Sequence, residues 1–287
     1  MSSFLKKEAY NEIKAPRNIS NLDDEHLLEL STFIYPFVKE LKKAEIGWYM
    51  PGHTPEEVGD KVASITKNGD YFGADYSKFD GHQTRDLRMI ACRVIADLVN
   101  PLERPRFLEL CYKEFNIICR TRHGVNYEAC GTMLSGSPLT TVGNTILNAF
   151  MYYRAIAHAG NYTHQEVFDK MEEEVICYGD DSLGPGYCKE AFLELCNQVG
   201  LKVKIEDSTH GAVFLSRIYL IDGCNMSMTD IRRVFPKLHL TTLPGDRAQA
   251  ACNKAIGLKS SSQEEYWMQM ICDYILYWWG DKPYDNT

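Results

Sequence analysis

Apolar residues recur every three or four positions along much of this 287-residue chain, the spacing that is typical of amphipathic helices. The longest such run covers 21–45, and its apolar face consists of Leu27, Leu28, Leu30, Phe33, Ile34, Phe37, Val38 and Leu41. The same spacing predicts further helices over 56–67, 84–99, 138–158, 188–199, 229–234, 246–256 and 262–279. These helices leave only short segments in which strands could form.

Short runs of β-prone residues lie between the predicted helices. One run covers 71–76, and another covers 174–178 and leads into Gly179, whose backbone freedom suits a tight turn. A second short strand is predicted directly after this turn. A further strand is predicted over 201–205, and a pair of strands over 212–221. The pattern predicts an α+β fold in which a small antiparallel sheet is backed by helices.

The predicted turn presents two adjacent carboxylates, Asp180 and Asp181, at the tip of a hairpin. Like charges side by side are unfavourable unless a cation neutralises them, and hard oxygen ligands suit Mg²⁺ or Mn²⁺. A solvated Asp-Asp turn would show the same pattern, so the pair alone does not decide. Asp75 closes an earlier strand and Asp80 stands at the entry to a helix, so further acidic groups are at hand. Together they predict a divalent-metal site.

A loop of small residues covers 131–138 and runs into the helix predicted from 138. Pro138 fits the first turn of that helix, and Ser135 or Ser137 can cap it. Polar side chains follow along the helix at Thr141, Asn144, Thr145 and Asn148. Small polar residues on a helix usually face solvent or cap turns.

The order DYSKFDG (75–81), SGSPLTTVGNT (135–145) and YGDD (178–181) resembles the palm motifs of RNA-dependent RNA polymerases of positive-strand RNA viruses. The run at 14–20 resembles the basic fingers motif of the noda-like and tombus-like group, and 200–204 and 214–217 resemble the fourth and fifth palm motifs. This resemblance implies a polymerase palm with partial fingers and a partial thumb. The expected divisions are partial fingers at 1–70, palm at 71–222 with a fingers insertion near 101–132, and the start of a thumb at 223–287.

The resemblance implies template-directed RNA synthesis by two-metal nucleotidyl transfer, with Asp75, Asp180 and Asp181 holding two Mg²⁺ or Mn²⁺ ions. Lys202 or Lys204 is the implied general acid, and the sequence leaves both open. The residues implied to bind the nucleotide are Lys14, Arg17, Asp80, Ser135, Gly136, Thr140 and Asn144. Phe214 and Arg217 are implied to contact the primer end of the RNA.

Three other interpretations compete with an RNA polymerase. A reverse transcriptase also carries an aromatic-x-Asp-Asp hairpin, but a bulky aromatic residue typically guards its sugar pocket, whereas Asp80 and Asn144 are polar. An inactive polymerase-like scaffold would be expected to lack one of the three metal-site aspartates, and all are present. The order of the motifs disfavours a generic metal-dependent phosphotransferase.

The overall charge of the chain limits the ways in which it could bind RNA. A net charge of −8 and a pI near 5.5 argue against nucleic-acid binding by bulk charge, so a local basic track is required. The segment 104–122 interleaves Arg and Lys with aromatic residues, which can track a single-stranded template. A plain amphipathic helix and hairpin would look similar.

The expected partners follow from the resemblance: an RNA template, a nascent RNA strand and nucleoside triphosphates. Since little chain surrounds the palm motifs, the sequence is expected to belong to a longer viral replicase. The implied setting is the host cytoplasm, at membrane-associated replication complexes. No apolar run in the sequence reaches the roughly 18–20 residues needed to span a bilayer.

Overall fold

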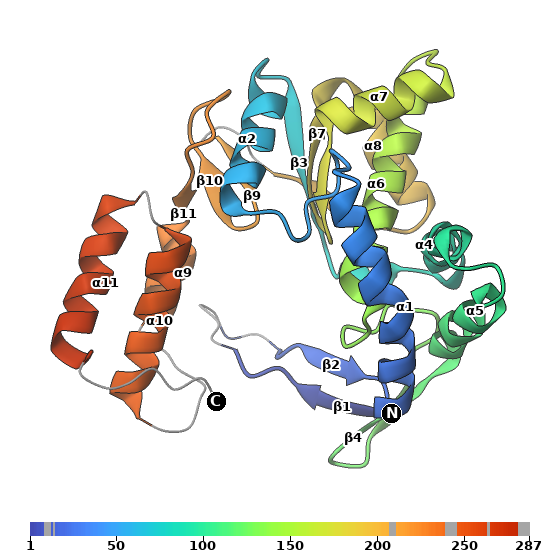
Figure 1. Cartoon of the computed structure of the whole chain (residues 1–287), viewed down its shortest axis with the longest axis horizontal. Helices are drawn as coiled ribbons and strands as arrows, with labels where there is room; N and C mark the ends of the chain where they lie inside the picture. The colour runs from blue at the N-terminus through green and yellow to red at the C-terminus, as the bar shows by residue number, and fades with distance from the viewer. Residues whose placement is uncertain (9–12, 14, 207–210, 239–245, 263–264, 281–287) are drawn as a thin grey trace.

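The computed structural model describes residues 1–8, 13, 15–206, 211–238, 246–262 and 265–280. Within them the chain forms three small sheets accompanied by helices (Figure 1), which confirms the predicted α+β class. None of the helices in this described part is both long and apolar enough to cross a membrane.

The central sheet has the strand order β6-β7-β3-β8, and every neighbouring pair is antiparallel. Its strands are β6 (Ile176–Tyr178), β7 (Asp181–Pro185), β3 (Tyr71–Tyr76) and β8 (Val203–Ile205). Side chains alternate between the two faces of a strand. In β3, Phe72, Ala74 and Tyr76 are buried on one face, so Asp75 points to the other.

Helices cover the apolar face of this sheet. They are α4 (Arg85–Leu98), α6 (Leu139–Ala159), α7 (His164–Glu174) and α8 (Lys189–Gln198). The ring of Phe192 packs 4.4 Å from that of Tyr152 and 5.4 Å from that of Phe72. A Cβ at Gly184 would lie 2.2 Å from the Tyr152 ring, so glycine is what lets α6 approach the sheet this closely.

A second sheet, in the order β2-β1-β4-β5, joins the N-terminus to a distant segment. It contains β1 (Ser2–Leu5), β2 (Asn18–Asn21), β4 (Ile118–Thr121) and β5 (Asn126–Glu128). The helices near it are α1 (Asp24–Lys43), α5 (Arg104–Lys113) and the 3₁₀ turn η1 (Glu114–Asn116). β1 pairs in parallel with β4, so part of the predicted fingers and the predicted fingers insertion share one sheet.

The third sheet, β11-β10-β9, leads into the C-terminal helices. Its strands are β9 (Ala212–Phe214), β10 (Arg217–Tyr219) and β11 (Met228–Thr229), and the helices after it are α9 (Ile231–Leu238), α10 (Arg247–Ser261) and α11 (Tyr266–Trp279). α10 and α11 pack side by side around a small core that includes Ala255, Met268 and Cys272, at the left of Figure 1. The remaining helices are α2 (Pro55–Thr66), α3 (Phe79–His82) and the turn η2 (Gly186–Cys188).

Candidate active site

The register of the central sheet brings the predicted metal-site aspartates together. Ala74 of β3 lies opposite Ser182 of β7, so the same antiparallel register places Asp75 opposite Asp181. Adjacent strands are about 4.8 Å apart. Asp180 sits beside them in the turn between β6 and β7, where Gly179 has a φ of +61°, a conformation that favours glycine.

Side chains of α6 and β3 fix this turn through a set of hydrogen bonds. The Gly179 N–H donates to Thr145 Oγ1 at 2.8 Å, and Asn148 Nδ2 donates to the Gly179 carbonyl at 3.1 Å. Tyr76 in turn donates its hydroxyl proton to Asn148 Oδ1 at 3.1 Å. Thr145 and Asn148 are fully buried, so the expectation that these helix positions face solvent is wrong for both. The signal in the sequence was polar residues embedded in an otherwise apolar stretch of helix.

Sequence analysis missed a fourth carboxylate, Glu206, which follows β8. Its N–H donates to the Gly73 carbonyl at 2.9 Å, and its Oε2 would lie 2.9 Å from a Cβ built on Gly73. Gly73 and Asp75 share a face of β3, so the absence of a side chain at Gly73 makes room for Glu206 beside the aspartates. We call Asp75, Asp180, Asp181 and Glu206 the acidic cluster.

The pKa values of three carboxylates in the acidic cluster are raised, first by desolvation and then by like charges nearby. Desolvation, then the charges of Asp180 and Asp75, raise the pKa of Asp181 to about 6, although Arg233 on α9 opposes the rise. Desolvation and the charges of Asp181 and Asp75 raise the pKa of Glu206 to about 7. The pKa of Asp180 is also raised by desolvation, with a contribution from Asp75. Among the described residues, the ion pairs formed by carboxylates lie outside this cluster.

This donor set fits a hard divalent cation. It offers ionisable oxygens whose charge no neighbouring lysine, arginine or histidine of the described chain neutralises through an ion pair. No three His, Cys, Asp or Glu side chains of the described residues stand close enough to form a ready-made metal cage. Mg²⁺ in polymerase sites is usually bound by one or two carboxylates together with substrate phosphates, so such a cage is not required.

The register of β8 distinguishes the two candidate general acids. Lys204 is the direct antiparallel partner of Asp75, so the two side chains share a face. Lys202 lies one residue before β8, and its carbonyl accepts from the Ser77 N–H at 2.8 Å. Lys204 is therefore the candidate that the sheet register places beside Asp75, whereas Lys202 lies outside the strand.

Asp80 and Asn144 lie in direct contact beside the acidic cluster. Asn144 Nδ2 donates to Asp80 Oδ1 at 2.7 Å, while Gln83 Nε2 donates to Asn144 Oδ1 at 2.7 Å. Burial raises the pKa of Asp80, and the bond from Asn144 opposes that rise. Gln83, which is buried, fixes which way the Asn144 amide points, and sequence analysis did not identify it.

The loop at 131–138 packs against strand β2. The Gly136 N–H donates to the Ser20 carbonyl at 3.1 Å, and a Cβ at Gly136 would lie 2.2 Å from Asn21 Oδ1. Ser135 Oγ accepts from the Ser20 N–H at 3.4 Å. The Thr140 hydroxyl bonds to carbonyls of the loop itself. The loop is thus tied to the strand that directly follows Arg17.

A family model described as viral RNA-dependent RNA polymerase matches residues 11–239, more than half of the chain. The chain belongs to this family. The RNA-directed RNA polymerase of Pariacoto virus is 37% identical over 267 residues, which cover 90% of this chain and 27% of that protein. That of Striped jack nervous necrosis virus is 35% identical over 248 residues, covering 84% of this chain and 25% of that protein.

The crystal structure of the RNA-dependent RNA polymerase of a human picorbirnavirus, with its insertion loop deleted, has a similar fold, with a TM-score of 0.75. The match covers 93% of this chain and 54% of that one at 18% sequence identity. The predicted palm architecture is therefore confirmed. The chain spans about a quarter of the length of the curated relatives it matches. Polymerases of this family use divalent metal ions.

Arg17, the first candidate to contact a nucleotide triphosphate, lies directly before strand β2. Its Nε donates to Glu8 Oε1 at 2.6 Å, and its Nη2 bonds to the other oxygen of the same carboxylate. The positive charge of Arg17 also lowers the pKa of Asp180, against the larger effect of desolvation. Lys14, the second candidate, lies outside the described residues.

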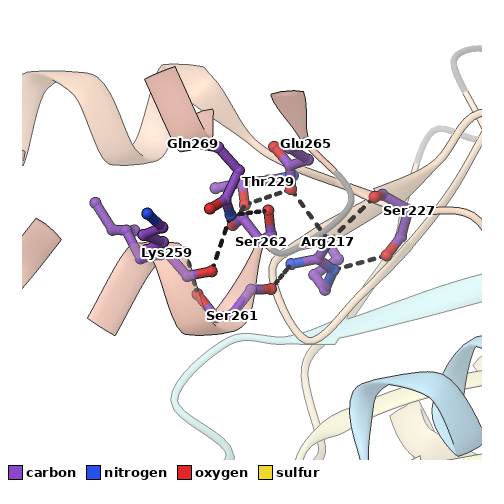
Figure 2. A network of polar contacts seen from close by, with 9 residues as sticks. Arg217, Ser227, Thr229, Lys259, Ser261, Ser262, Glu265 and Gln269 are labelled. Carbon is purple, nitrogen blue, oxygen red and sulfur yellow. Dashed lines mark hydrogen bonds and ion pairs between the residues drawn. The ribbon is translucent and has the colours of Figure 1, made fainter. Parts of the chain in front are cut away.

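The hairpin of β9 and β10 uses Phe214 and Arg217 for its own packing. Phe214 is 2% exposed and belongs to the core beside α2, so its burial disfavours stacking on an RNA base. Figure 2 shows Arg217 between Ser227 on one side and Ser261 and Glu265 on the other. Its guanidinium donates to Ser227 Oγ at 2.6 Å, to the Ser261 carbonyl at 2.7 Å and to Glu265 Oε1 at 3.1 Å. Contact of either residue with a primer stays a prediction.

The basic residues of segment 104–122 are largely engaged with acids. Arg106 pairs with Glu29 and Glu109, and Lys113 pairs with Glu109 as well. Arg104 lies 3.4 Å from an oxygen of Asp97. The alternative interpretation of this segment, an amphipathic helix followed by a hairpin, describes α5, β4 and β5.

Proposed function

We propose that this chain is the catalytic part of a viral replicase that synthesises RNA on an RNA template by nucleotidyl transfer. The observation that carries the proposal is the sheet register, which sets Asp75 opposite Asp181 and beside Asp180, next to the Asp80–Asn144 pair. Family membership supports the same activity.

The acidic cluster would bind two Mg²⁺ or Mn²⁺ ions through Asp75, Asp180 and Asp181. Such ions lower the pKa of the 3′-hydroxyl of the growing RNA and offset charge on the leaving pyrophosphate. The protein must present these aspartates ionised, and the raised pKa values of Asp180 and Asp181 mean that ionisation and metal binding reinforce one another. Thr145 and Asn148 contribute by fixing the turn that carries Asp180.

Arg17 would exchange the Glu8 carboxylate for the triphosphate of the incoming nucleotide. A guanidinium that already binds both oxygens of a carboxylate is shaped for the similar fork of a phosphate. Lys204, opposite Asp75, is the better placed of the two candidate lysines to donate a proton to the leaving pyrophosphate.

Asp80 and Asn144 would read the ribose. A carboxylate and an amide held 2.7 Å apart can accept from and donate to a 2′-hydroxyl, which a deoxynucleotide lacks. This polar pair favours an RNA polymerase over a reverse transcriptase. All three metal-site aspartates are present, which disfavours an inactive scaffold.

The proposed partners are an RNA template, a nascent strand and nucleoside triphosphates, with the rest of a longer viral replicase. The proposed setting is the host cytoplasm at membrane-associated replication complexes, as for the positive-strand RNA virus polymerases that the chain resembles.

Primer extension tests the proposal. Purified chain, alone and within a full-length replicase, is given a primed RNA template, Mg²⁺ and the four ribonucleotides, with Asp180→Asn as the matched control. Template-dependent extension that the control lacks is the expected result. No extension by the full-length protein under any metal condition would refute the assignment.

A further inference from the structure

A buried ion pair lies beneath the loop at 131–138. Arg88 of α4 and Glu114 of η1 are 1% and 0% exposed, and Arg88 Nη2 lies 2.5 Å from Glu114 Oε2. Neither residue belongs to a motif that the sequence analysis identified. The Phe115 ring lies 4.8 Å from the guanidinium carbon and covers one of its faces.

Each partner of this pair also bonds to the loop, at opposite ends of it. Arg88 Nη1 donates to the Thr132 carbonyl at 2.9 Å, and Ser137 Oγ donates to Glu114 Oε1 at 2.8 Å. The Ser137 hydroxyl also accepts from the Leu139 N–H at 3.1 Å, which is the start of α6. The pair therefore fixes both the point where the loop begins and the point where it passes into the helix that carries Asn144.

The loop connects this pair to the groups proposed to read the ribose. The Met133 N–H donates to the Asp80 carbonyl at 3.0 Å, one residue beyond the Arg88 contact. Asp80 in turn accepts from Asn144. A path of hydrogen bonds and covalent neighbours thus leads from Arg88 and Glu114 to both members of the polar pair.

Stability alone does not account for two charges buried at this place. Replacing a buried ion pair by apolar residues of similar volume is often neutral or stabilising, because the pair must first be desolvated. An apolar pair of that size could fill the space, but it could not bond to Thr132 and Ser137. What the ion pair adds to the molecule is a fixed geometry for the loop.

We propose that Arg88 and Glu114 are positioning residues that set the conformation of the loop at 131–138 and thereby tune the ribose selectivity of the site. The inference rests on the proposed polymerase function for its kinetic consequence. Its structural part, restraint of the loop, does not depend on activity.

Two variants separate positioning from packing. Ser137→Ala removes the link from Glu114 to the loop, together with the bond to the Leu139 N–H, and leaves the ion pair in place. The double variant Arg88→Met with Glu114→Leu keeps an apolar core of similar volume but removes both links. Lys170→Met, which breaks an ion pair on α7 away from the loop, is the matched control.

The first measurement is the ratio of ribo- to deoxynucleotide incorporation efficiency in full-length protein. We expect Ser137→Ala to lower this ratio about five- to tenfold, the effect of one hydrogen bond, and the double variant to lower it further. Both variants should keep a melting temperature near that of the wild type. Lys170→Met should change neither quantity. An unchanged ratio in both variants of an active, selective enzyme would overturn the inference and leave the proposed function intact.

The second measurement needs no catalysis. Amide hydrogen exchange within 131–138 in metal-free protein should accelerate in both variants while exchange in the central sheet stays unchanged. If the loop exchanges at the wild-type rate in both, the ion pair does not restrain it and the proposal is wrong, whether or not the protein makes RNA.

Discussion

The acidic cluster and the Arg88–Glu114 pair are two groups of charges that the fold arranges in opposite ways. The cluster gathers four carboxylates on one end of the sheet, and desolvation, followed by the like charges nearby, raises the pKa values of Asp180, Asp181 and Glu206. The buried pair joins Arg88 to Glu114, and each charge has further hydrogen-bond partners in the loop. The buried His26 also places its Nε2 3.7 Å from Glu114 Oε1. One arrangement is unfavourable until a cation binds, and in the other the two charges neutralise each other within the protein, although Arg88 Nε has no hydrogen-bond partner among the described residues.

This difference gives a criterion for telling ligand-binding charges from architectural ones. Charges that the fold brings together without compensation point to a partner that is supplied from outside. Charges that are buried and paired with each other indicate a structural role, because removing one partner leaves the other charge buried and unpaired. Substitutions in the two clusters should therefore differ in kind as well as in size.

The largest effect is expected for Asp180→Asn. RNA synthesis should fall to background because the variant loses a metal ligand, while the fold is retained. In metal-free buffer its melting temperature should equal or exceed that of the wild type, because the substitution relieves carboxylate repulsion. Primer extension and a thermal melt measure the two quantities. Appreciable synthesis by the variant would remove Asp180 from the catalytic set.

Glu114→Leu should have the opposite effect on stability, because it should destabilise the folded protein. It leaves the buried Arg88 guanidinium without its counter-charge, which costs about 3–5 kcal/mol of unfolding free energy. Adding Arg88→Met should recover most of that loss. Urea unfolding of the two single variants and the double variant tests this. Equal stability of Glu114→Leu and the wild type would mean that the pair is not buried in solution.

How far the sequence predicted these two clusters depends on the range of the interactions. Periodicity located α6 within one residue of its ends, and the predicted helix at 21–45 contains α1, because both patterns are local. The turn at Gly179 and the strand at 71–76 were also predicted, and strand alternation then fixed the side on which Asp75 lies.

The residues that sequence analysis missed act over longer separations. Arg88 and Glu114 are 26 residues apart in the sequence, and no local sequence pattern predicts that they pair. Glu206 follows a strand whose register with β3 becomes known only from the folded sheet. The strands β1 and β2 were not predicted either, because β1 is stabilised by pairing with distant β4. Local chemistry in the sequence pointed to the aspartates that are proposed to bind metal, but not to the residues that hold them in place.

Arg17→Ala should reduce the catalytic efficiency for nucleotides by about ten- to a hundredfold. A charge-assisted hydrogen bond to a phosphate contributes roughly 1.5–3 kcal/mol. The loss should therefore appear in the dependence of the rate on nucleotide concentration and not in its dependence on template concentration. Steady-state kinetics at varied nucleotide concentration provide the measurement. Lys170→Met serves again as the control. An unchanged catalytic efficiency for Arg17→Ala would mean that Arg17 binds Glu8 but does not contact the nucleotide.

Asp80→Ala and Asn144→Ala should weaken the preference for ribonucleotides more than they weaken metal binding. Each buried group left unpaired by a deoxynucleotide costs roughly 1–3 kcal/mol, and removing it abolishes that discrimination. The ratio of ribo- to deoxynucleotide incorporation on one RNA template reports the effect. Retention of the wild-type ratio by both variants would place sugar selection elsewhere, and a wild type that favours deoxynucleotides would contradict the RNA-polymerase assignment.

The smallest effect is a pH dependence of stability that belongs to the acidic cluster alone. Folding raises the pKa of Asp181 to about 6 and that of Glu206 to about 7, from ordinary values of 3.8 and 4.5. Between the ordinary and the raised values, the folded state binds more protons than the unfolded state. The contribution of these groups to stability is therefore most favourable at low pH and is lost as pH rises through 6 to 7.

We therefore expect the melting temperature of the metal-free wild type to fall between pH 5 and pH 8 relative to that of Asp181→Asn with Glu206→Gln. Subtracting the variant removes the titration of carboxylates elsewhere in the chain. Saturating Mg²⁺ should reverse the trend, because the metal binds the ionised forms and stabilises them most at high pH. A difference between the two proteins that stays constant from pH 5 to pH 8 would show that these carboxylates are not crowded, and the contrast with the Arg88–Glu114 pair would then rest on geometry alone.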